Sequence, residues 1–586
     1  MNQAAIFHRS SGSLCYAADK DTAVIRLQTG KEVEQATIIC ADPFINELTR
    51  RKEWYGQRLP MQRLVELPNH ILWEYRTQPP FKRLQYYFEV QADGETYCVF
   101  DNRICPVQER CKASCQYFKL AWINPADVIA PPDWVSDTVW YQIMPDRFCR
   151  DKNAPDDPKF IPWGRKKYFG FNHTYGGNLK GITERLPYLA SLGITGLYLT
   201  PIFLAGSYHK YNTFDYRTVD PDFGTEEDLR ELVRQAHQRG IRIMLDGVFN
   251  HCGTAFFAWQ DVCRQGRNSP YYDWFFINQE DFLSERFDSA DGRYYTFSFW
   301  SGMPKLNTNH PEVIRYFSEI CGYWVREWDI DGIRFDVGDE VSHTFLKALR
   351  RHLKPLKQDL FLLGEIWFDS QNWLDGTEYD AVMNYPLSSC INDFSRCPTM
   401  TAMDFMLALN RCLTMYPEQV TAVLFNFLDT HDTVRIAEQC GGNLHLLYQK
   451  LTLLLTLPGT PCLYYGTEIA LCGKDADDNR PCMPWTAIEQ GQHTAVYQDV
   501  QKLIRLRHDY PALKTTVITC LLDNTYPRLL HYRRFDHKQH SPAIGVVLNG
   551  ESTAVPFTVT GTLLYADRFD GHTLLPYGTI IYESNE

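Results

Sequence analysis

The spacing of apolar and polar positions divides the chain into three regions. Residues 1–122 carry short apolar stretches rich in β-branched and aromatic residues, such as 84–100, interrupted by turn residues such as Asp93-Gly94. Stretches of this kind predict β-strands, and several of them in a row are typical of a β-sandwich. We therefore expect an N-terminal β-sandwich domain over 1–122, joined to the next region by the Pro-containing segment 123–134.

From about residue 137, apolar strands alternate with amphipathic helices. The segment 225–240 shows the pattern most fully: Thr225 is placed to cap a helix, Asp228 occupies the capping-box position, and Gly240 is placed to end it. Seven helices are expected, at 179–193, 225–240, 311–327, 342–357, 402–415, 443–457 and 496–508. Eight strands are expected, at 137–145, 194–202, 241–249, 331–337, 360–367, 379–385, 421–429 and 460–466.

This alternation fixes the predicted fold class, which is α/β. Apolar strands separated by helices predict a parallel sheet, and eight such units predict a closed (β/α)8 TIM barrel. The catalytic barrel is expected over 123–510, with a small inserted domain at about 252–306 after the third strand. Short β segments return after about residue 511, so we expect a C-terminal β-sandwich domain over 511–586.

Composition and charge exclude several classes of protein. Hydrophobic residues make up 44% and charged residues 22% of the chain, as in soluble globular proteins. A formal net charge of −12 argues against nucleic acid and anionic membranes as partners. No apolar run is long enough to span a bilayer and the first residues lack the layout of an export signal, so we expect a cytoplasmic protein.

Cysteines and aromatic residues are both numerous. The 18 cysteines lack paired metal-binding spacing, and even the closest cluster, Cys105, Cys111 and Cys115, is expected to hold reduced thiols rather than a metal. Aromatic residues make up 14% of the chain. They either fill the cores of several domains or supply flat faces on which sugar rings stack.

Candidate chemistry appears where the predicted barrel strands end. Polar residues follow the third, fourth, fifth and seventh strands, namely Asp246, Asn250 and His251, then Arg334 and Asp336, then Glu365 and Trp367, then His431 and Asp432. The carboxyl ends of all barrel strands open on one mouth, so we expect these side chains to converge there. Taken singly, each of them could instead be a solvated loop residue.

A ring of carboxylates with His and Arg suits cleavage of glycosidic bonds. That reaction needs one carboxylate at the anomeric carbon and one carboxylic acid that protonates the leaving oxygen. Arg334 and Asp336 face the same side of a strand, and the guanidinium would favour the ionised form that a nucleophile requires. Glu365 lies in an apolar strand beside Trp367, where desolvation would favour the protonated form of a general acid.

Five sequence motifs resemble those of a known family. The segments "DGVFNH" (246–251), "GIRFDVGDE" (332–340), "GEIW" (364–367) and "FLDTHD" (427–432) resemble, in this order, the four motifs of the α-amylase family, glycoside hydrolase family 13. "MPKLN" (303–307) resembles the fifth motif of its neopullulanase, cyclomaltodextrinase and maltogenic amylase branch. The resemblance covers essentially the whole chain.

The resemblance implies a retaining α-glucan hydrolase. Its expected substrates are the α-1,4 and also α-1,6 glucosidic bonds of cyclodextrins, maltooligosaccharides, pullulan or starch, with transglycosylation as a second outcome. Two alternatives remain open: an α-1,6-glucosidase or transglycosylase on the same scaffold, and a non-catalytic relative such as a transporter accessory subunit. The second would be expected to carry a membrane helix and to lack the carboxylates.

The resemblance also implies a role for each site residue. Asp336 matches the nucleophile, Glu365 the acid/base and Asp432 the transition-state stabiliser, whereas Asp246 is expected to support the site. The expected substrate-contacting residues are Tyr211, His251, Phe297, Arg334, Trp367, His431 and Arg480, the last with Asp475 or Asp477 as its acidic partner.

The chain departs from the pattern of the branch at two places. Gly338-Asp339-Glu340 stands where the branch usually has Ala-Asn-Glu, and Thr430 precedes His431. Both departures are expected near the acceptor side, so they leave the linkage preference and the ratio of hydrolysis to transfer open.

Two further expectations concern a metal and a partner subunit. Hard oxygen ligands are concentrated at Asp151, Asn153, Asp156, Asp157, the Gly176 carbonyl and Asn178. This set suits Ca²⁺ and resembles the calcium loop of the family. The alternative is a solvated acidic loop. The resemblance further implies a homodimer in which the N-terminal domain narrows the active-site mouth, so that cyclodextrins are preferred to starch.

Overall fold

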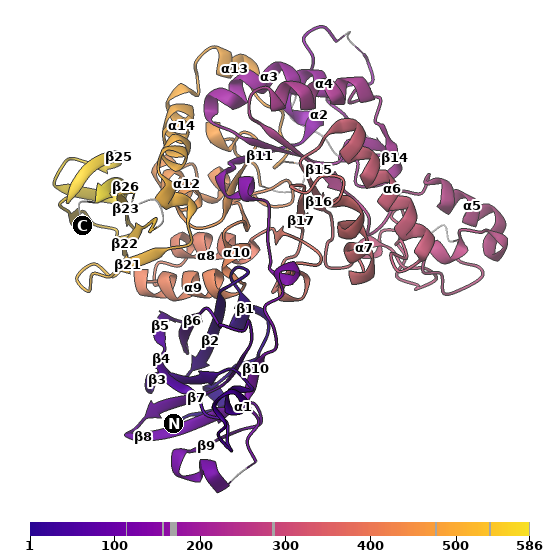
Figure 1. The fold of residues 1–586 in the computed structure, drawn as a ribbon. Coiled ribbons are helices and arrows are strands. Elements are labelled where there is room, and N and C mark those ends of the chain that lie inside the picture. The colour runs from indigo at the N-terminus through magenta and orange to yellow at the C-terminus, as the bar shows by residue number, and fades with distance from the viewer. Residues whose placement is uncertain are drawn as a thin grey trace. The chain divides into compact units, whose positions relative to one another are not determined.

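The computed structural model describes residues 1–112, 114–154, 157–164, 173–283, 288–474, 478–537 and 541–584. Two compact units are distinguished along the chain (Figure 1). The first contains Met1–Ala130 together with the short segments Gln371–Gly376 and Thr399–Thr421. The second contains Pro131–Ser370, Thr377–Pro398 and Ala422–Glu586.

The first unit is a β-sandwich, as predicted. One antiparallel sheet has the strand order β1-β2-β6-β5 and the other β4-β3-β7-β8-β9, with β10 on β7. Alternating side chains such as Ile25, Leu27, Ile38 and Phe88 form a shared buried core. The strands are β1 (Cys15–Ala17), β2 (Ala23–Thr29), β3 (Val33–Ala41), β4 (Gln57–Pro60), β5 (Gln62–Glu66), β6 (Ile71–Thr77), β7 (Leu84–Ala92), β8 (Glu95–Phe100), β9 (Arg103–Pro106) and β10 (Phe118–Leu120).

Three helices belong to the same unit. They are α1 (Ile45–Thr49), α9 (Ala402–Thr414) and α10 (Glu418–Thr421). The Asn410 amide donates to the Glu66 carbonyl (2.9 Å), and Arg76 pairs with Glu418. The expected helix at 402–415 therefore forms, but it packs on the sandwich.

The second unit contains the predicted eight-stranded parallel barrel. Its strand order is β18-β17-β16-β15-β12-β11-β20-β19, and a parallel bridge from Met383 to Phe425 joins the two ends. The strands are β11 (Trp140–Ile143), β12 (Gly196–Leu199), β15 (Arg242–Gly247), β16 (Gly332–Phe335), β17 (Phe361–Gly364), β18 (Ala381–Val382), β19 (Phe425–Asn426) and β20 (Thr460–Tyr464). Nearly every strand residue is buried, because helices cover the outer face of the barrel (Figure 1).

Among the described residues, this unit has six α-helices that the periodicity predicted and five that it did not. They are α2 (Pro145–Phe148), α3 (Leu179–Leu192), α4 (Glu226–His237), α5 (Phe257–Gln265), α6 (Pro311–Trp328), α7 (His343–Leu353), α8 (Tyr385–Arg396), α11 (Ile436–Gln439), α12 (Leu444–Thr456), α13 (Trp485–Glu489) and α14 (Thr494–Asp509). The capping box of Thr225 and Asp228 is present on α4.

Helix α8 was not predicted. Its sequence "YPLSSCINDFSR" is rich in Ser, Cys and Asn, which have low helix propensity, and Pro386 suggests a break. In the structure this proline lies in the first turn, where its missing N–H costs nothing, and the Asn384 side chain caps the helix by accepting the Leu387 N–H (3.3 Å). The cap and the packing of buried residues such as Leu387 and Ile391 therefore form the helix despite its weak propensity.

The regions after the second and third barrel strands are irregular. A small hairpin, β13 (Phe203–Ala205) and β14 (Thr213–Val219), follows β12. The expected insertion at 252–306 contains α5 and isolated bridges, of which His251–Lys305 is one. That bridge ties the end of the insertion back to the carboxyl end of β15.

The C-terminal region is strand-rich, as expected. Its six strands form one hydrogen-bonded sheet in which β26 pairs with β23, β24 and β25. They are β21 (Ile518–Leu521), β22 (Leu529–Arg534), β23 (Ala543–Asn549), β24 (Val555–Pro556), β25 (Gly561–Phe569) and β26 (Thr573–Ser584).

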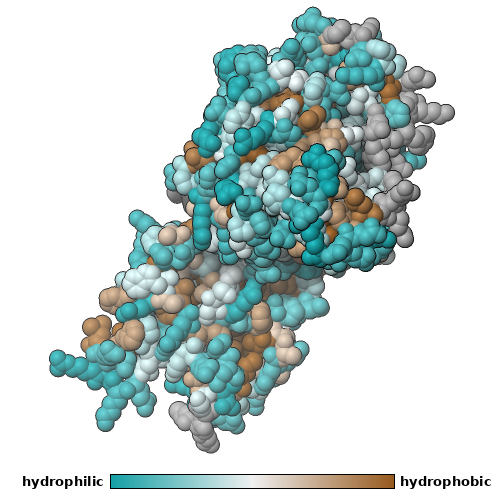
Figure 2. All heavy atoms as spheres, turned by 90° about the vertical axis from the view of Figure 1, so that its right-hand side faces the viewer, coloured by the Kyte–Doolittle hydropathy of each residue, from teal (hydrophilic) through white to brown (hydrophobic). Residues whose placement is uncertain are grey.

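Surface character agrees with the composition. Figure 2 shows mostly hydrophilic residues on the face it presents, with hydrophobic residues in separate small groups. Of the helices in the described ranges, none has both the length and the apolar character needed to cross a bilayer. Most of the cysteines in those ranges are buried.

Candidate active site

Arg334 lies at the centre of a cluster of three carboxylates. Parallel pairing of β15 and β16 places it beside Asp246, and its Nη1 lies 3.0 Å from each oxygen of that carboxylate. The same nitrogen donates to Asp336 Oδ1 (3.0 Å), and Nη2 lies 2.7 Å from Glu365 Oε2. The guanidinium is completely buried, so its charge acts on all three acids with little screening by solvent.

The charges of this cluster favour a state in which one of its carboxyl groups keeps a proton. Burial, the largest cause, holds the pKa of Asp336 well above its ordinary value; Arg334 opposes this, whereas the Glu365 and Asp246 carboxylates add to it. Burial also raises the pKa of Asp246, against the effect of Arg334. One cation facing three buried acids suits a site that must hold an ionised carboxylate and a protonated one together.

Glu365 follows an apolar, buried strand and lies beside Trp367, as expected. Its carboxyl group nevertheless has polar contacts on both oxygens, which the sequence did not indicate: Oε2 accepts the Val337 N–H (2.9 Å) and faces Arg334. Oε1 receives longer hydrogen bonds from Trp367 Nε1 (3.3 Å) and the Tyr385 hydroxyl (3.4 Å). Because Arg334 contacts both Asp336 and Glu365, its charge alone does not assign the ionised role to Asp336 and the protonated role to Glu365.

Asp432 lies at a more open part of the site. Its side chain is 37% exposed, and Arg480 Nη2 donates to its Oδ1 (3.3 Å). Arg480 also donates to the His431 carbonyl (2.8 Å) and to the Tyr208 hydroxyl (2.8 Å). The acidic partner of Arg480 is thus Asp432; the two partners expected from the sequence, Asp475 and Asp477, lie outside the described residues.

A hydrogen-bonded chain of neutral groups connects His431 to Asp246. Gln142 donates to His431 Nδ1 (2.8 Å), which leaves the imidazole proton on Nε2, 2.6 Å from the Tyr211 hydroxyl. Tyr211 in turn donates to Asp246 Oδ2 (2.9 Å). Burial, followed by the nearby Arg480 and Arg334, holds the pKa of His431 well below its ordinary value, so the ring stays neutral.

His251 and Phe297 form another wall. Their rings stack with centroids 4.9 Å apart, and His251 Nε2 lies 3.1 Å from the Tyr211 carbonyl. Burial lowers the pKa of His251 to about 3. The neutral imidazole donates its one N–H, on Nε2, to the Tyr211 carbonyl, so it positions Tyr211 and cannot act as a cation near neutral pH.

Trp367 carries the exposed aromatic face that was expected at the site. Its side chain is 53% exposed, and its other face stacks on Tyr385 with centroids 3.9 Å apart. One ring therefore faces solvent while its neighbour holds it in place, as a sugar platform requires.

Sequence reasoning missed several contributors to the site. Gln142 on β11 and Tyr198 on β12, whose hydroxyl donates to Asp246 (2.6 Å), would have been found by applying the strand-end rule to the first two strands as well. Tyr385 ends the expected sixth strand, so the same rule applied there would have found it too. Tyr208 and Val337 had no such signal, because a loop and a backbone amide supply them.

The two sequence departures lie beside this cluster: the Thr430 hydroxyl accepts the Asp432 N–H (3.1 Å), and Gly338 follows the Val337 amide that contacts Glu365. Gly338 allows close packing, since a Cβ there would come within 2.9 Å of the Tyr379 hydroxyl and 3.1 Å of the Glu365 backbone. Lys305 of the "MPKLN" segment pairs with Glu340 Oε2 (2.8 Å) and also contacts Asn250. The tertiary structure thus joins three motifs that are far apart in the chain.

The proposed calcium ligands are partly described. The Asn178 N–H donates to the Cys149 carbonyl (3.0 Å), which brings the 176–178 turn against the start of the acidic loop. Asp151 and Asp157 accept backbone N–H groups of their own loop, from Asn153 (2.8 Å) and Lys159 (3.0 Å). Asp156 lies outside the described residues. Carboxylate, amide and carbonyl oxygens are the donor types that a hard cation prefers, but among the described residues no three acidic, His or Cys side chains lie close enough together to hold a metal.

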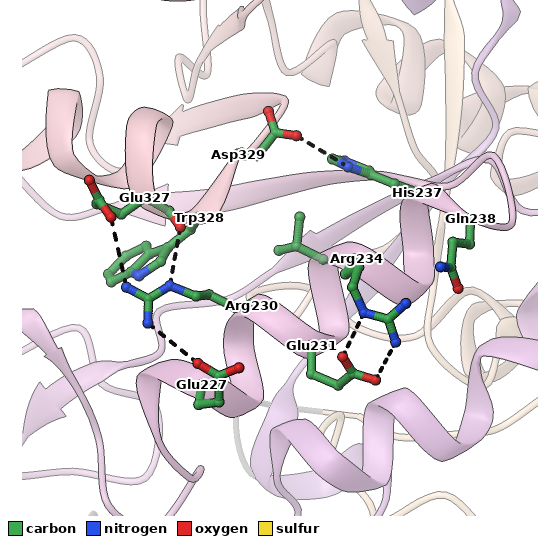
Figure 3. Close-up of a pocket in the computed structure, with 10 residues that line it drawn as sticks. Glu227, Arg230, Glu231, Arg234, His237, Gln238, Glu327, Trp328 and Asp329 are labelled. Atoms are coloured by element: carbon green, nitrogen blue, oxygen red, sulfur yellow. Dashed lines mark hydrogen bonds and ion pairs between the residues drawn. The ribbon is translucent and has the colours of Figure 1, made fainter.

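A hollow in the surface lies away from the carboxylate cluster, and none of the predicted site residues lines it. It has a volume of about 640 Å³ and is lined by α4 and the end of α6. Figure 3 shows that its charged side chains pair with one another: Arg230 with Glu227 and Glu327, and Arg234 with Glu231. These pairs satisfy the charges within the hollow.

Comparison with known proteins gives matches along the whole chain. Residues 142–516 match the family described as "Alpha amylase, catalytic domain", and residues 1–124 match "Alpha amylase, N-terminal ig-like domain". The chain is 38% identical over 597 residues to a cyclomaltodextrinase of Geobacillus thermopakistaniensis (strain MAS1), covering 99% of each chain. It is 40% identical over 517 residues to an intracellular maltogenic amylase of Bacillus subtilis, covering 88% of this chain and 86% of that one. A solved structure of a cyclomaltodextrinase superposes with a TM-score of 0.89 at 33% identity, covering 100% of both chains.

Proposed function

Because the chain belongs to the α-amylase family and is a retaining glycoside hydrolase, we propose that Asp336, Glu365 and Asp432 carry out the hydrolysis of α-glucans. The supporting observation is the shared guanidinium of Arg334, which contacts both Asp336 and Glu365 at the carboxyl ends of β16 and β17. Two carboxyl groups held together at a barrel mouth are what a double-displacement glycosidase requires.

The proposed reaction has two balanced steps. Asp336 attacks the anomeric carbon while Glu365 gives its proton to the leaving oxygen, so that a glycosyl ester forms and the sugar leaves as an alcohol. Glu365 then takes a proton from water, whose oxygen displaces Asp336 and restores both carboxyl groups. Asp432, partly exposed and held by Arg480, is placed to accept hydrogen bonds from sugar hydroxyls.

The test removes each carboxyl group separately. Asp336→Asn and Glu365→Gln should each lower turnover of β-cyclodextrin roughly a thousandfold or more, because either change removes half of the mechanism. Asp329→Asn, at an exposed carboxylate outside the site, serves as the control. Products followed by NMR should first appear as α-anomers; initial release of β-anomers would rule out the proposed roles.

For the substrate, we propose that the protein prefers cyclodextrins to starch because it forms a homodimer in which the partner subunit narrows the active-site mouth. The solved relative named cyclomaltodextrinase matches the whole chain, including the N-terminal sandwich that supplies none of the catalytic residues. That sandwich carries exposed apolar side chains suited to an interface, among them Phe44, Leu48 and Phe81. A second subunit that narrows the mouth would exclude bulky starch.

For the metal, we propose that Asp151, Asn153, Asp156, Asp157, the Gly176 carbonyl and Asn178 hold a structural Ca²⁺. A bound ion would tie the loop after β11 to the turn that begins α3, and it would stabilise the folded state by mass action.

For the location, we propose the cytoplasm. The 40% identical relative from Bacillus subtilis is named an intracellular enzyme. Cys15, Cys40 and Cys98 are buried thiols without a disulfide, as suits a reducing compartment.

A further inference from the structure

Gln142 lies on the inner face of the barrel, near the carboxyl end of β11. Side chains alternate along a strand, so Gln142 faces the same side as Trp140, which belongs to the apolar core of the barrel. Parallel pairing sets Gln142 level with Tyr198 on β12 and Tyr464 on β20. Gln142 is only 1% exposed, and a buried amide needs a hydrogen-bonding partner.

That partner is the imidazole of His431. The Gln142 amide nitrogen lies 2.8 Å from Nδ1 of the ring. On the other side of the ring, Nε2 lies 2.6 Å from the Tyr211 hydroxyl, whose own proton goes to Asp246, and 3.1 Å from Asp432 Oδ2. Both groups at Nε2 are therefore acceptors. The single proton of a neutral imidazole belongs on Nε2, and Nδ1 accepts an N–H from Gln142.

The surroundings of the ring keep it neutral. Burial is the largest cause of the lowered pKa of His431, followed by the positive charges of Arg480 and Arg334, whereas the charge of Glu365 acts in the opposite sense. The titratable and charged groups that bear on the ring come from several elements, and they are Tyr211, His209, Arg334, Glu365, Asp432 and Arg480.

The position of the imidazole proton matters for Asp432. With the proton on Nδ1, a lone pair on Nε2 would face the Asp432 carboxylate and repel it. The other ion pair of this carboxylate, with Arg480, is longer (3.3 Å), and the side chain is 37% exposed. The contact with His431 therefore contributes much of what holds Asp432 in place.

We propose that Gln142 holds His431 in the tautomer with its proton on Nε2 and thereby positions Asp432. The inference rests on the proposed role of Asp432 in the hydrolysis. Gln142 donates to Nδ1, and Nε2–H in turn stabilises the Asp432 carboxylate. Gln142 is thus a positioning residue, which acts on the reaction through His431.

Gln142→Glu tests this role, because a carboxyl group changes from donor to acceptor when it ionises. At low pH the introduced carboxyl group and His431 together hold two protons, and Nε2 keeps its own. When the pair loses one proton, the other lies between the carboxylate and Nδ1, so Nε2 faces Asp432 with a lone pair. Relative to wild type, kcat on β-cyclodextrin should fall about tenfold or more as pH rises from about 5 to about 8, with KM changed by less than about twofold.

Three other variants separate this effect from loss of packing. Gln142→Met removes the donor without adding an acceptor, so its loss of kcat should be smaller and should not depend on pH. In a His431→Asn background, Gln142→Glu should cause no pH-dependent loss, because the path through the imidazole is already broken. Gln449→Glu makes the same change at a buried glutamine of α12, which donates to the Asn549 and Gly578 carbonyls, and it should leave the pH profile unchanged.

A direct measurement on the wild-type enzyme does not depend on whether any Gln142 variant folds. In protein labelled with ¹⁵N-histidine, the His431 signals are those lost in His431→Asn, and they should show protonated Nε2 and unprotonated Nδ1. The opposite tautomer, equal pH-independent losses in Gln142→Glu and Gln142→Met, or a pH-dependent loss that persists without His431 would overturn the inference. Asp432→Asn, measured in parallel, tests the proposed function itself: full turnover in that variant would contradict the role of Asp432, whatever Gln142 does.

Discussion

Replacement of Arg334 by Gln offers the most direct test of how the charge of the active site is balanced. The change removes one positive charge that lies 3.0 Å from Asp336 Oδ1 and equally close to Asp246. Two charges about 4 Å apart attract by about 4 kcal/mol at an effective dielectric constant of about 20. That energy corresponds to about three pKa units on a single acid. Since Arg334 is the cation that opposes the effect of burial on Asp336, we expect its loss to raise the apparent pKa of the nucleophile.

The sign of the effect follows from the ionised nucleophile. The pKa of Asp336 is already raised by burial and held back by Arg334, so loss of the guanidinium raises it further. Activity on the acidic side is lost as pH falls through this pKa. The acidic limb of the kcat/KM profile should therefore move to higher pH in Arg334→Gln, and by less in Arg334→Lys, which keeps the charge.

The measurement is a pH profile on cyclodextrin, with circular dichroism to confirm that each variant is folded. A folded Arg334→Gln variant whose activity is lowered equally at every pH, with the acidic limb unmoved, would refute the charge argument. Such a result would leave Arg334 with a purely steric role.

Three further predictions concern stability and assembly. Asp331, fully buried at the start of the fourth barrel strand, has its pKa held below its ordinary value, against burial, by His237 and Lys357. Asp331→Asn should therefore cost about 3 kcal/mol at pH 7, and in thermal unfolding its difference from wild type should shrink as pH falls below about 4. If the 151–157 loop binds calcium, chelator should lower the melting temperature and added Ca²⁺ should restore it; an unchanged curve, with no calcium by elemental analysis, would contradict the site. Deletion of 1–122 should give a monomer with weaker preference for β-cyclodextrin over starch, and a full-length protein that sediments as a monomer at micromolar concentration while cleaving both equally would contradict the dimer.

The sequence alone determined most of the barrel and its chemistry. All eight strands lie where apolar runs predicted them, and the capping box of Thr225 and Asp228 forms as its spacing indicated. These signals are local: an apolar run or a cap acts within a few residues, whatever the rest of the chain does. Because parallel strands share one mouth, the strand-end rule also brought Asp246, Asp336 and Glu365 together.

Only the tertiary structure decided which groups act on one another. Nothing in the motif order shows that Arg334 contacts three acids, or that the partner of Arg480 is Asp432. The role of the Val337 amide depends on a left-handed backbone that its own side chain disfavours, so only the packing of two adjacent strands can impose it. Helix α8 has weak propensity and gains its stability from packing and an end cap. Contacts of this kind join residues far apart in the chain, and closure of the barrel, rather than local preference, sets them.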